Sequence, residues 1–147
     1  MLDVDCIFCR IAAGTSPCDA IYQDDAILAF MDIRPANDGH CLVIPKAHFR
    51  TVLEMPPAAF AEVAASVVKV ARAVDDVLRP GGISLVQANG ALAGQTVPHV
   101  HVHVLPRRAG DDLPLNWDRS RRDDSIGDSA YIADMAARLR ARLRDAR

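Results

Sequence analysis

Residues 98–107 have the sequence PHVHVHVLPR, and this stretch decides the fold. Strict alternation of histidine with valine is a strand pattern. It predicts a strand over residues 99–105 with three imidazoles on one face and the valines on the other. At about 3.3 Å per residue, neighbouring histidines start about 6.6 Å apart and the outer two about 13 Å apart. Two neighbouring imidazoles could bind one metal ion, whereas a straight strand does not bring all three to one ion. The three histidines must therefore divide between different roles.

The rest of the chain supplies partners for this strand. Residues 5–13 predict a short helix that ends at Gly14. Apolar residues that recur at three- and four-residue steps after Pro56 predict a helix from Pro57 to about Leu78. Strands, one long helix and further strands are typical of an α+β domain with a mainly antiparallel sheet. The other predicted strands cover residues 21–22, 26–31, 40–44 and 83–87.

A charged extension, residues 118–147, follows a domain that we place at residues 1–117. Its apolar stripe predicts an amphipathic helix with arginines on the solvated face and near the C-terminal end, where they suit the helix dipole. A basic patch for nucleic acid is the alternative interpretation of the same arginines. The stripe consists of Ile132, Met135, Leu139 and Leu143.

Composition limits the class of partner. The 147 residues carry a net charge of −2, which argues against binding nucleic acid by phosphate neutralisation. No apolar run approaches the roughly 20 residues that cross a bilayer. Residues 1–5 are acidic where a secretory signal would be basic and then apolar. We therefore expect a cytoplasmic protein without nucleic-acid or membrane partners.

The four cysteines fall into two kinds. Cys6 and Cys9 form a C-x-x-C motif, which in a cytosolic protein favours metal ligation or a redox pair over a structural disulfide. Cys18 and Cys41 lack such spacing. We interpret Cys18 as a loop thiol and Cys41 as a small buried apolar residue.

Several segments together resemble the histidine triad (HIT) superfamily of nucleotidyl hydrolases and transferases. The histidine row with its Gly-Gln-Thr-Val lead-in is the most specific of them. The resemblance covers residues 5–109 and implies a five-stranded, mainly antiparallel sheet with one short and one long helix, to which the C-terminal helix is added, in a two-fold homodimer. The other matching segments are DCIFCRI (residues 5–11), AFMDI (residues 29–33) and GHCLVIPKAH (residues 39–48).

The resemblance implies a catalytic role for the histidine row. In this family the middle histidine attacks the α-phosphorus and carries the nucleotidyl group until water releases it, and that role falls on His101. A neutral imidazole, with a pKa near about 6.5, is an available nucleophile at physiological pH. His103 would donate to the non-bridging phosphate oxygens. His40 would orient the imidazoles and, with His99, complete the catalytic set.

The resemblance also implies a metal site. Tetrahedral zinc needs four nitrogen or sulfur ligands, and Cys6 and Cys9 supply two of them. The zinc-containing branch of the family completes its site with the histidine after Pro-Lys-x and with the first triad histidine, which are His48 and His99 here. Four protein ligands leave no open position for water, so we expect one structural zinc per chain.

A purine nucleotide is the substrate that the resemblance implies. Asp32 matches the family's ribose-binding carboxylate, and Thr96 matches a position whose hydroxyl approaches the phosphate. Ser16 departs from the family, where an apolar residue contacts the base, and Ala88 replaces a frequent amide, for which Asn89 is a stand-in. The expected nucleotide-binding residues are Ile7, Phe8, Phe30, Asp32, Asn89, Gln95, Thr96 and Val97.

The favoured function is hydrolysis at the α-phosphate of purine nucleotide phosphoramidates through a nucleotidyl-histidine intermediate. Hydrolysis of dinucleoside polyphosphates is an alternative, because residues 104–111 also resemble that branch of the family. A non-catalytic nucleotide-binding protein is a second alternative. A metal-centred enzyme that uses His101 and His103 as zinc ligands, with His40 as the only obvious third donor, is another.

Overall fold

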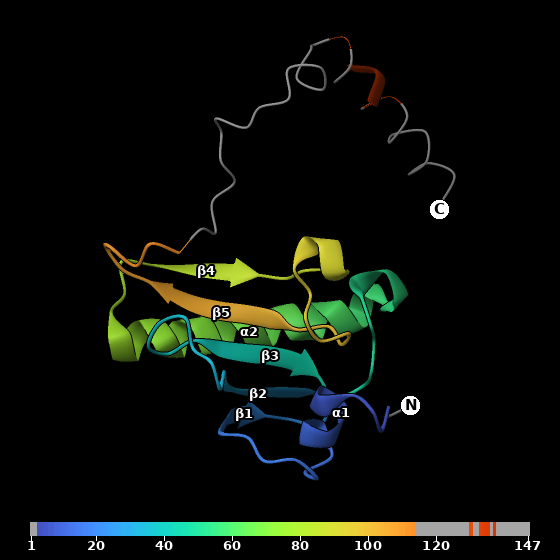
Figure 1. Ribbon diagram of the computed structural model, residues 1–147, viewed down its shortest axis with the longest axis horizontal. Helices are drawn as coiled ribbons and strands as arrows, with labels where there is room; N and C mark the ends of the chain where they lie inside the picture. The colour runs from blue at the N-terminus through green and yellow to red at the C-terminus, as the bar shows by residue number, and fades with distance from the viewer. Residues whose placement is uncertain (1–2, 114–129, 131–132, 136, 138–147) are drawn as a thin grey trace. The chain divides into compact units, whose positions relative to one another are not determined.

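The computed structural model describes residues 3–113, 130, 133–135 and 137. Residues up to Leu113 form one compact unit, built on a five-stranded sheet in the order β1-β2-β3-β5-β4 (Figure 1). Every neighbouring pair of strands is antiparallel, which confirms the predicted fold class. None of the described helices is long and apolar enough to cross a membrane. The strands are β1 (Ala20–Gln23), β2 (Ile27–Met31), β3 (Cys41–Pro45), β4 (Gly82–Val86) and β5 (Val102–Arg107).

Two helices cover opposite faces of the sheet because the strands alternate their apolar side chains. Ile27 and Val43 face the long helix α2 (Pro57–Leu78), which lies behind the sheet in Figure 1. Leu28 and Leu42 face the short helix α1 (Ile7–Ala12). The sheet therefore has an α2 side and an α1 side, each with its own apolar core. Two 3-10 turns, η1 (Val52–Glu54) and η2 (Ala91–Ala93), complete the described elements of the domain.

The long helix has the bounds that the sequence predicts. Pro57 occupies its first turn, where a missing N–H costs nothing, and Val63, Val67 and Val70 bury its apolar stripe. Its last residue, Leu78, packs so closely on Gly39 that a Cβ at residue 39 would clash with it. Gly39 also has a φ of +78°, which favours glycine. The end of α2 thus rests on the turn that precedes β3.

The predicted strand over residues 99–105 is wrong at its start, because β5 begins at Val102. The ladder with β3 runs only from Val104 to Val102. Before Val102 the backbone finds other partners: the Val100 N–H donates to the Phe49 carbonyl at 2.7 Å, and the His99 N–H donates to the Val97 carbonyl at 2.8 Å. The three histidines therefore do not stand on one straight strand.

The extension is described only in part. Residues 130, 133–135 and 137 are helical. Most of the predicted apolar stripe, Ile132, Leu139 and Leu143, lies outside the described residues. The amphipathic helix and the boundary at residue 117 stay predictions.

Candidate functional site

A cavity of about 530 Å³ lies on the α1 side of the sheet, and His101 and His103 form part of its wall. Apolar side chains from α1, β2 and β3 make up most of the lining, and a few polar groups complete it. This combination is typical of a small-molecule site. Of the residues expected to bind nucleotide, the cavity is lined by Ile7, Phe8, Phe30, Asp32, Thr96 and Val97.

The two remaining expected residues, Asn89 and Gln95, do not line the cavity. The Asn89 Oδ1 accepts the Val52 N–H at 2.9 Å. The Gln95 Nε2 donates to the Arg50 carbonyl at 2.6 Å, and its Oε1 accepts the Gly90 N–H at 2.7 Å. Both amides therefore tie the loop before the histidines to the segment around η1.

His101 is held in one tautomer by a backbone group. It is only 3% exposed and packs edge to face on Phe8, with ring centroids 5.3 Å apart. Its Nδ1 lies 2.7 Å from the carbonyl oxygen of His99. Because a carbonyl can only accept, the proton of the neutral ring is on Nδ1, and Nε2 carries the lone pair. The nitrogen left for a ligand in the cavity is thus the nucleophilic one.

His103 is held in the opposite tautomer by His40. The Ala36 N–H donates to the Nδ1 of His40 at 3.1 Å, so the proton of neutral His40 is on Nε2. That Nε2 lies 2.9 Å from the Nδ1 of His103 and donates to it. Neutral His103 then carries its own proton on Nε2. Two rings 5.0 Å apart therefore offer the cavity a lone pair from His101 and an N–H from His103.

Burial keeps these imidazoles neutral. It lowers the pKa of His103 to about 4, and the neighbouring His101 and His40 act in the same direction. Burial also lowers the pKa of His101, against the opposing effects of its hydrogen bond to His99 and of the Asp32 charge. The pKa of His40 falls for the same reason, while Asp32 opposes the change. At neutral pH the row is uncharged and its tautomers are those fixed by the hydrogen bonds.

Asp32 stands where the cavity meets this chain of histidines. Its Oδ1 accepts the Arg34 N–H at 2.8 Å, and its Oδ2 lies 3.7 Å from the His40 Nε2. Donor atoms of Asp32, His40 and His103 lie within 4.8 Å of one another, but His101 is not in that group. The described residues therefore do not bring His101, His103 and His40 together around one metal ion, as the metal-centred alternative requires.

A second cluster, the cysteine cluster, lies beside the histidines of the cavity and consists of four potential metal ligands. Donor atoms of Cys6, Cys9, His48 and His99 all lie within 4.8 Å of one another. The Cys9 Sγ is 3.2 Å from the His48 Nδ1, and the His99 Nδ1 is 3.5 Å from Cys6 Sγ and 3.6 Å from Cys9 Sγ. Zinc bonds of about 2.3 Å to sulfur and about 2.0–2.1 Å to nitrogen give S···N edges of about 3.6 Å in a regular tetrahedron. The four side chains have the donor types and the spacing of such a site.

His99 connects the two clusters. It is fully buried, and its Nε2 donates to the Pro45 carbonyl at 2.8 Å, which leaves the Nδ1 lone pair facing the cysteines. Its own carbonyl accepts the proton of His101. His99 does not line the cavity. Its side chain thus belongs to the cysteine cluster, and its backbone carbonyl bonds to His101.

Comparison with known proteins identifies the family. Residues 13–110 match the HIT domain family. This chain belongs to the HIT family. The HIT relatives include an adenylylsulfatase of Arabidopsis thaliana, 39% identical over 76% of this chain and 57% of its own length. The chain thus spans little more than half of that relative.

Other HIT relatives match over most of their length. The protein hit of Bacillus subtilis is 40% identical over 82% of this chain and 83% of its own length. An adenosine 5′-monophosphoramidase of Schizosaccharomyces pombe is 38% identical over 71% of this chain and 75% of its own length.

Solved HIT structures share the fold. A Bacillus subtilis HIT-family structure superposes with a TM-score of 0.86 at 34% identity, over 94% of this chain and 96% of its own. A zinc-bound histidine triad protein of Mycobacterium smegmatis gives a TM-score of 0.70 at 38% identity, over 90% of this chain and 96% of its own.

Several cavity residues of this HIT domain escape sequence reasoning. Ser16 is considered above only as a departure from the family, and nothing in the sequence marks Arg34, although it follows the Asp32 motif directly. These residues come from α1, from β3 and from the loops around residues 16–18 and 33–34, which only the tertiary fold brings together. The lining residues not expected from sequence are Ile11, Ser16, Pro17, Cys18, Ile33, Arg34 and Leu42.

Proposed function

We propose that this HIT protein hydrolyses purine nucleotide phosphoramidates at the α-phosphorus, through a covalent nucleotidyl intermediate on His101. One observation carries the proposal: a buried neutral imidazole offers its lone pair to the cavity beside an imidazole that offers an N–H. Attack on phosphorus needs the first, and charge on the non-bridging oxygens needs the second. The adenylylsulfatase and monophosphoramidase names of two relatives agree with a nucleotidyl hydrolase.

The proposed reaction has two displacements at phosphorus. The His101 Nε2 forms a bond to the α-phosphorus while the P–N bond of the substrate breaks, and the amine leaves with a proton from solvent. The nucleotidyl-imidazole is then cationic, and the His99 carbonyl stabilises it by accepting the Nδ1–H at 2.7 Å. Water next attacks phosphorus and loses a proton to solvent, the bond to Nε2 breaks, and the nucleoside monophosphate leaves with neutral His101 restored.

The apolar walls and Asp32 suit the nucleoside part of the substrate. A carboxylate oxygen can accept hydrogen bonds from vicinal ribose hydroxyls, and Phe8 and Phe30 offer aromatic surface to a base. Thr96 and Val97 line the same cavity as His101 and His103. We assign these residues to nucleotide binding.

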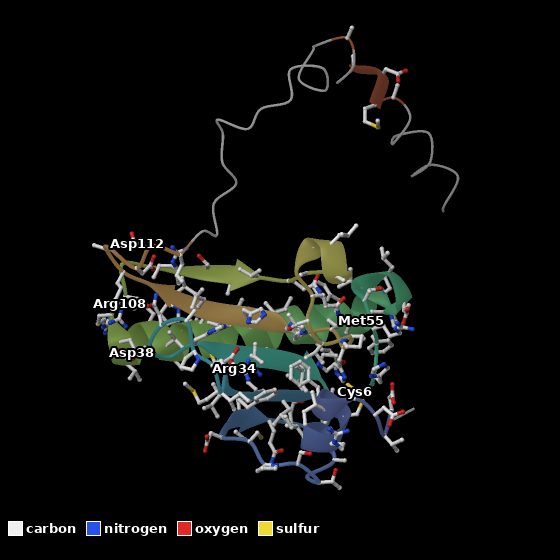
Figure 2. The ribbon with its side chains drawn as sticks, viewed as in Figure 1. Cys6, Arg34, Asp38, Met55, Arg108 and Asp112 are labelled. Atoms are coloured by element: carbon white, nitrogen blue, oxygen red, sulfur yellow. The ribbon has the colours of Figure 1, made fainter. Side chains whose placement is uncertain are left out.

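The leaving group is an amine in this proposal because the two arginines at the end of β5, which would be the partners of a polyphosphate, are engaged elsewhere. Arg107 forms a two-bonded ion pair with Asp111, at 2.6 and 2.7 Å, and this pair holds the pKa of Asp111 well below its usual range. Arg108 pairs with Asp38 at 3.2 Å, at the far end of the sheet in Figure 2. Neither arginine lines the cavity.

Side-by-side kinetics test this choice. An adenosine 5′-phosphoramidate with an alkylamine leaving group should have a kcat/KM at least tenfold above that of diadenosine polyphosphates, about 1.4 kcal/mol in the transition state. Both substrates are measured at one salt concentration. A reversed preference would assign the protein to dinucleoside polyphosphates, and no turnover of either would leave nucleotide binding without catalysis.

We also propose that Cys6, Cys9, His48 and His99 hold one structural zinc ion. The donor set of two thiols and two imidazoles, the S···N distances and the zinc-bound Mycobacterium smegmatis relative support it. Bound zinc would stabilise the two thiolates, whereas in the protein without zinc burial and the neighbouring Cys6 raise the pKa of Cys9. The site would tie α1 to the segment before β5.

A homodimer and a cytoplasmic location complete the proposal. Strand β4 is an edge of the sheet, and beside it lies a groove that includes Val68 of α2 and Leu85 of β4, 46% and 53% exposed. Apolar side chains next to an open strand edge suit a second copy of the same surface. Sedimentation equilibrium would measure the mass of the assembly.

A further inference from the structure

Arg34 is a cation whose position the proposed mechanism does not use. It lies on the β2–β3 connection, two residues after Asp32, and lines the same cavity (Figure 2). Its backbone N–H donates to the Asp32 Oδ1, which fixes the local turn. Its side chain is exposed, and its guanidinium makes no hydrogen bond or ion pair within residues 3–113.

Three other arginines of the domain are engaged. Arg107 pairs with Asp111, Arg108 with Asp38, and Arg10 donates to the Val4 carbonyl at 3.0 Å. Asp32 does not capture Arg34 either, since its second oxygen is turned toward His40 at 3.7 Å. Asp32 supplies the carboxylate and Arg34 the guanidinium of the cavity lining. A carboxylate and a guanidinium on one loop are both available to a ligand.

The direction of the nucleotide decides what Arg34 can reach. In a nucleotide the 5′ carbon and the 2′ and 3′ hydroxyls lie on opposite edges of the ribose. If Asp32 accepts a ribose hydroxyl and His101 attacks the 5′-phosphorus, Arg34 stands beside the hydroxyl edge and away from the leaving group. An anion within its reach is therefore a substituent on the ribose.

Resting on the proposed function, we infer that Arg34 is a specificity-determining residue that selects nucleotides carrying a phosphate on the 2′ or 3′ oxygen of the ribose. Asp32 binds the remaining hydroxyl, and the guanidinium of Arg34 donates to the added phosphate. The attraction between this phosphate and Arg34 offsets the repulsion between the phosphate and the Asp32 carboxylate. The substrate class is then a ribose-phosphorylated nucleotide joined at its 5′-phosphate to an amine.

Calorimetric titration of the full chain, loaded with zinc and kept at one ionic strength, tests the inference. The ligands are AMP, adenosine 2′,5′-bisphosphate and adenosine 3′,5′-bisphosphate. We expect one of the bisphosphates to bind at least tenfold more tightly than AMP, and the identity of that isomer assigns the oxygen. The preference should shrink at high salt, because the contact is partly exposed.

Two variants identify the residue. Arg34→Ala should reduce the preference to twofold or less, and Arg34→Lys should retain part of it. Arg108→Ala is the matched control, because it removes an exposed arginine of the same domain that lies outside the cavity. It should leave the preference intact.

The outcomes separate this inference from the proposed function. Tight AMP binding with equal affinity for all three ligands overturns the selection by Arg34 and leaves the hydrolase proposal standing. A preference that survives Arg34→Ala, or that disappears in Arg108→Ala, also overturns it. If AMP itself does not bind, the proposed function fails and the inference fails with it.

Discussion

The two clusters of histidines in this molecule share a residue type and a stretch of chain, yet they present opposite chemistry. In the cysteine cluster, His99 turns its lone pair inward toward two thiols and is fully buried. In the cavity cluster, His101 and His103 keep their Nδ1 atoms for internal bonds and leave Nε2 for a ligand. The group that occupies the other ring nitrogen decides the role of each histidine.

Removal of the proposed nucleophile, His101, should give the largest effect. We expect His101→Ala to lower kcat/KM by at least a thousandfold, because the proposed intermediate cannot form. Zinc content should stay at about one per chain, since His101 is not in the cysteine cluster. Single-turnover and steady-state assays measure the first, and elemental analysis the second. Retention of a tenth of the activity would remove His101 from its assigned role.

Removal of two ligands from the cysteine cluster should mainly lower the stability of the domain. A Cys6→Ser/Cys9→Ser variant should lose its zinc. A ligand at 1,000 times its Kd stabilises by about 4 kcal/mol, which for a domain of this size corresponds to a fall in Tm of about 10 °C or more. Calorimetry and elemental analysis check both, with Cys18→Ser as the control that keeps zinc. Unchanged metal content in the double variant would contradict the ligand assignment.

His40 should matter through His103 alone. His40→Leu removes the donor to the His103 Nδ1 and should reduce kcat about tenfold to a hundredfold with little change in KM. His40→Gln restores an N–H donor and should recover much of that loss. Equal losses in both variants would indicate a packing role in place of a positioning one.

The pH profile should show the smallest effect. A free imidazole is half protonated near pH 6.5, but burial lowers the pKa of His103 to about 4 and also lowers that of His101. The acidic limb of kcat/KM should therefore lie below the pH of 6.5 that a free imidazole would give. Asp32→Asn removes a charge that raises both pKa values, so this limb should move to still lower pH. An acidic limb at pH 6.5 would show that the imidazoles of His101 and His103 are exposed to water and that burial does not lower their pKa values.

The free energy of unfolding should also decrease as the pH falls, because of His103. The pKa of His103 is lower in the folded chain than in the unfolded chain, so the unfolded state binds more protons between about pH 4 and 6.5. The contribution of this residue is complete above about pH 6.5 and is lost as the pH falls toward 4. Equilibrium unfolding in urea of His103→Gln beside the unchanged chain would measure the difference, which should vanish if His103 titrates normally.

Local signals predict much of the fold. Two prolines and the Arg-Pro-Gly-Gly segment bound α2, and its bounds agree with the structure because each signal acts on its own turn. The start of β5 is mispredicted because the alternation of histidine and valine begins at His99, whereas the hydrogen bonds to β3 begin only at Val102. The Phe49 carbonyl accepts a hydrogen bond from the Val100 N–H, and the Pro45 carbonyl accepts one from the His99 ring. Both carbonyls lie about 50 residues earlier in the chain.

The candidate site divides in the same way. The cysteine and histidine motifs are predictable because their spacing is a property of the chain. The tautomers of His101 and His103 are not, since they depend on carbonyl and imidazole partners that only the tertiary fold supplies. Asn89 and Gln95 lie close to the histidines in sequence, yet their amides are used to hold a loop.

The cysteine cluster has a consequence for the order of events during synthesis. Its ligands are far apart in the chain, with Cys6 and His99 separated by 93 positions. Closing so long a loop is slow and depends on the sheet that aligns its ends. A growing chain that has emerged only as far as His48 can offer three ligands, and the fourth arrives just before β5. The proposed metal thus acquires its fourth ligand late, when most of the domain has left the ribosome. Full coordination of the metal should therefore coincide with formation of the last strand, β5.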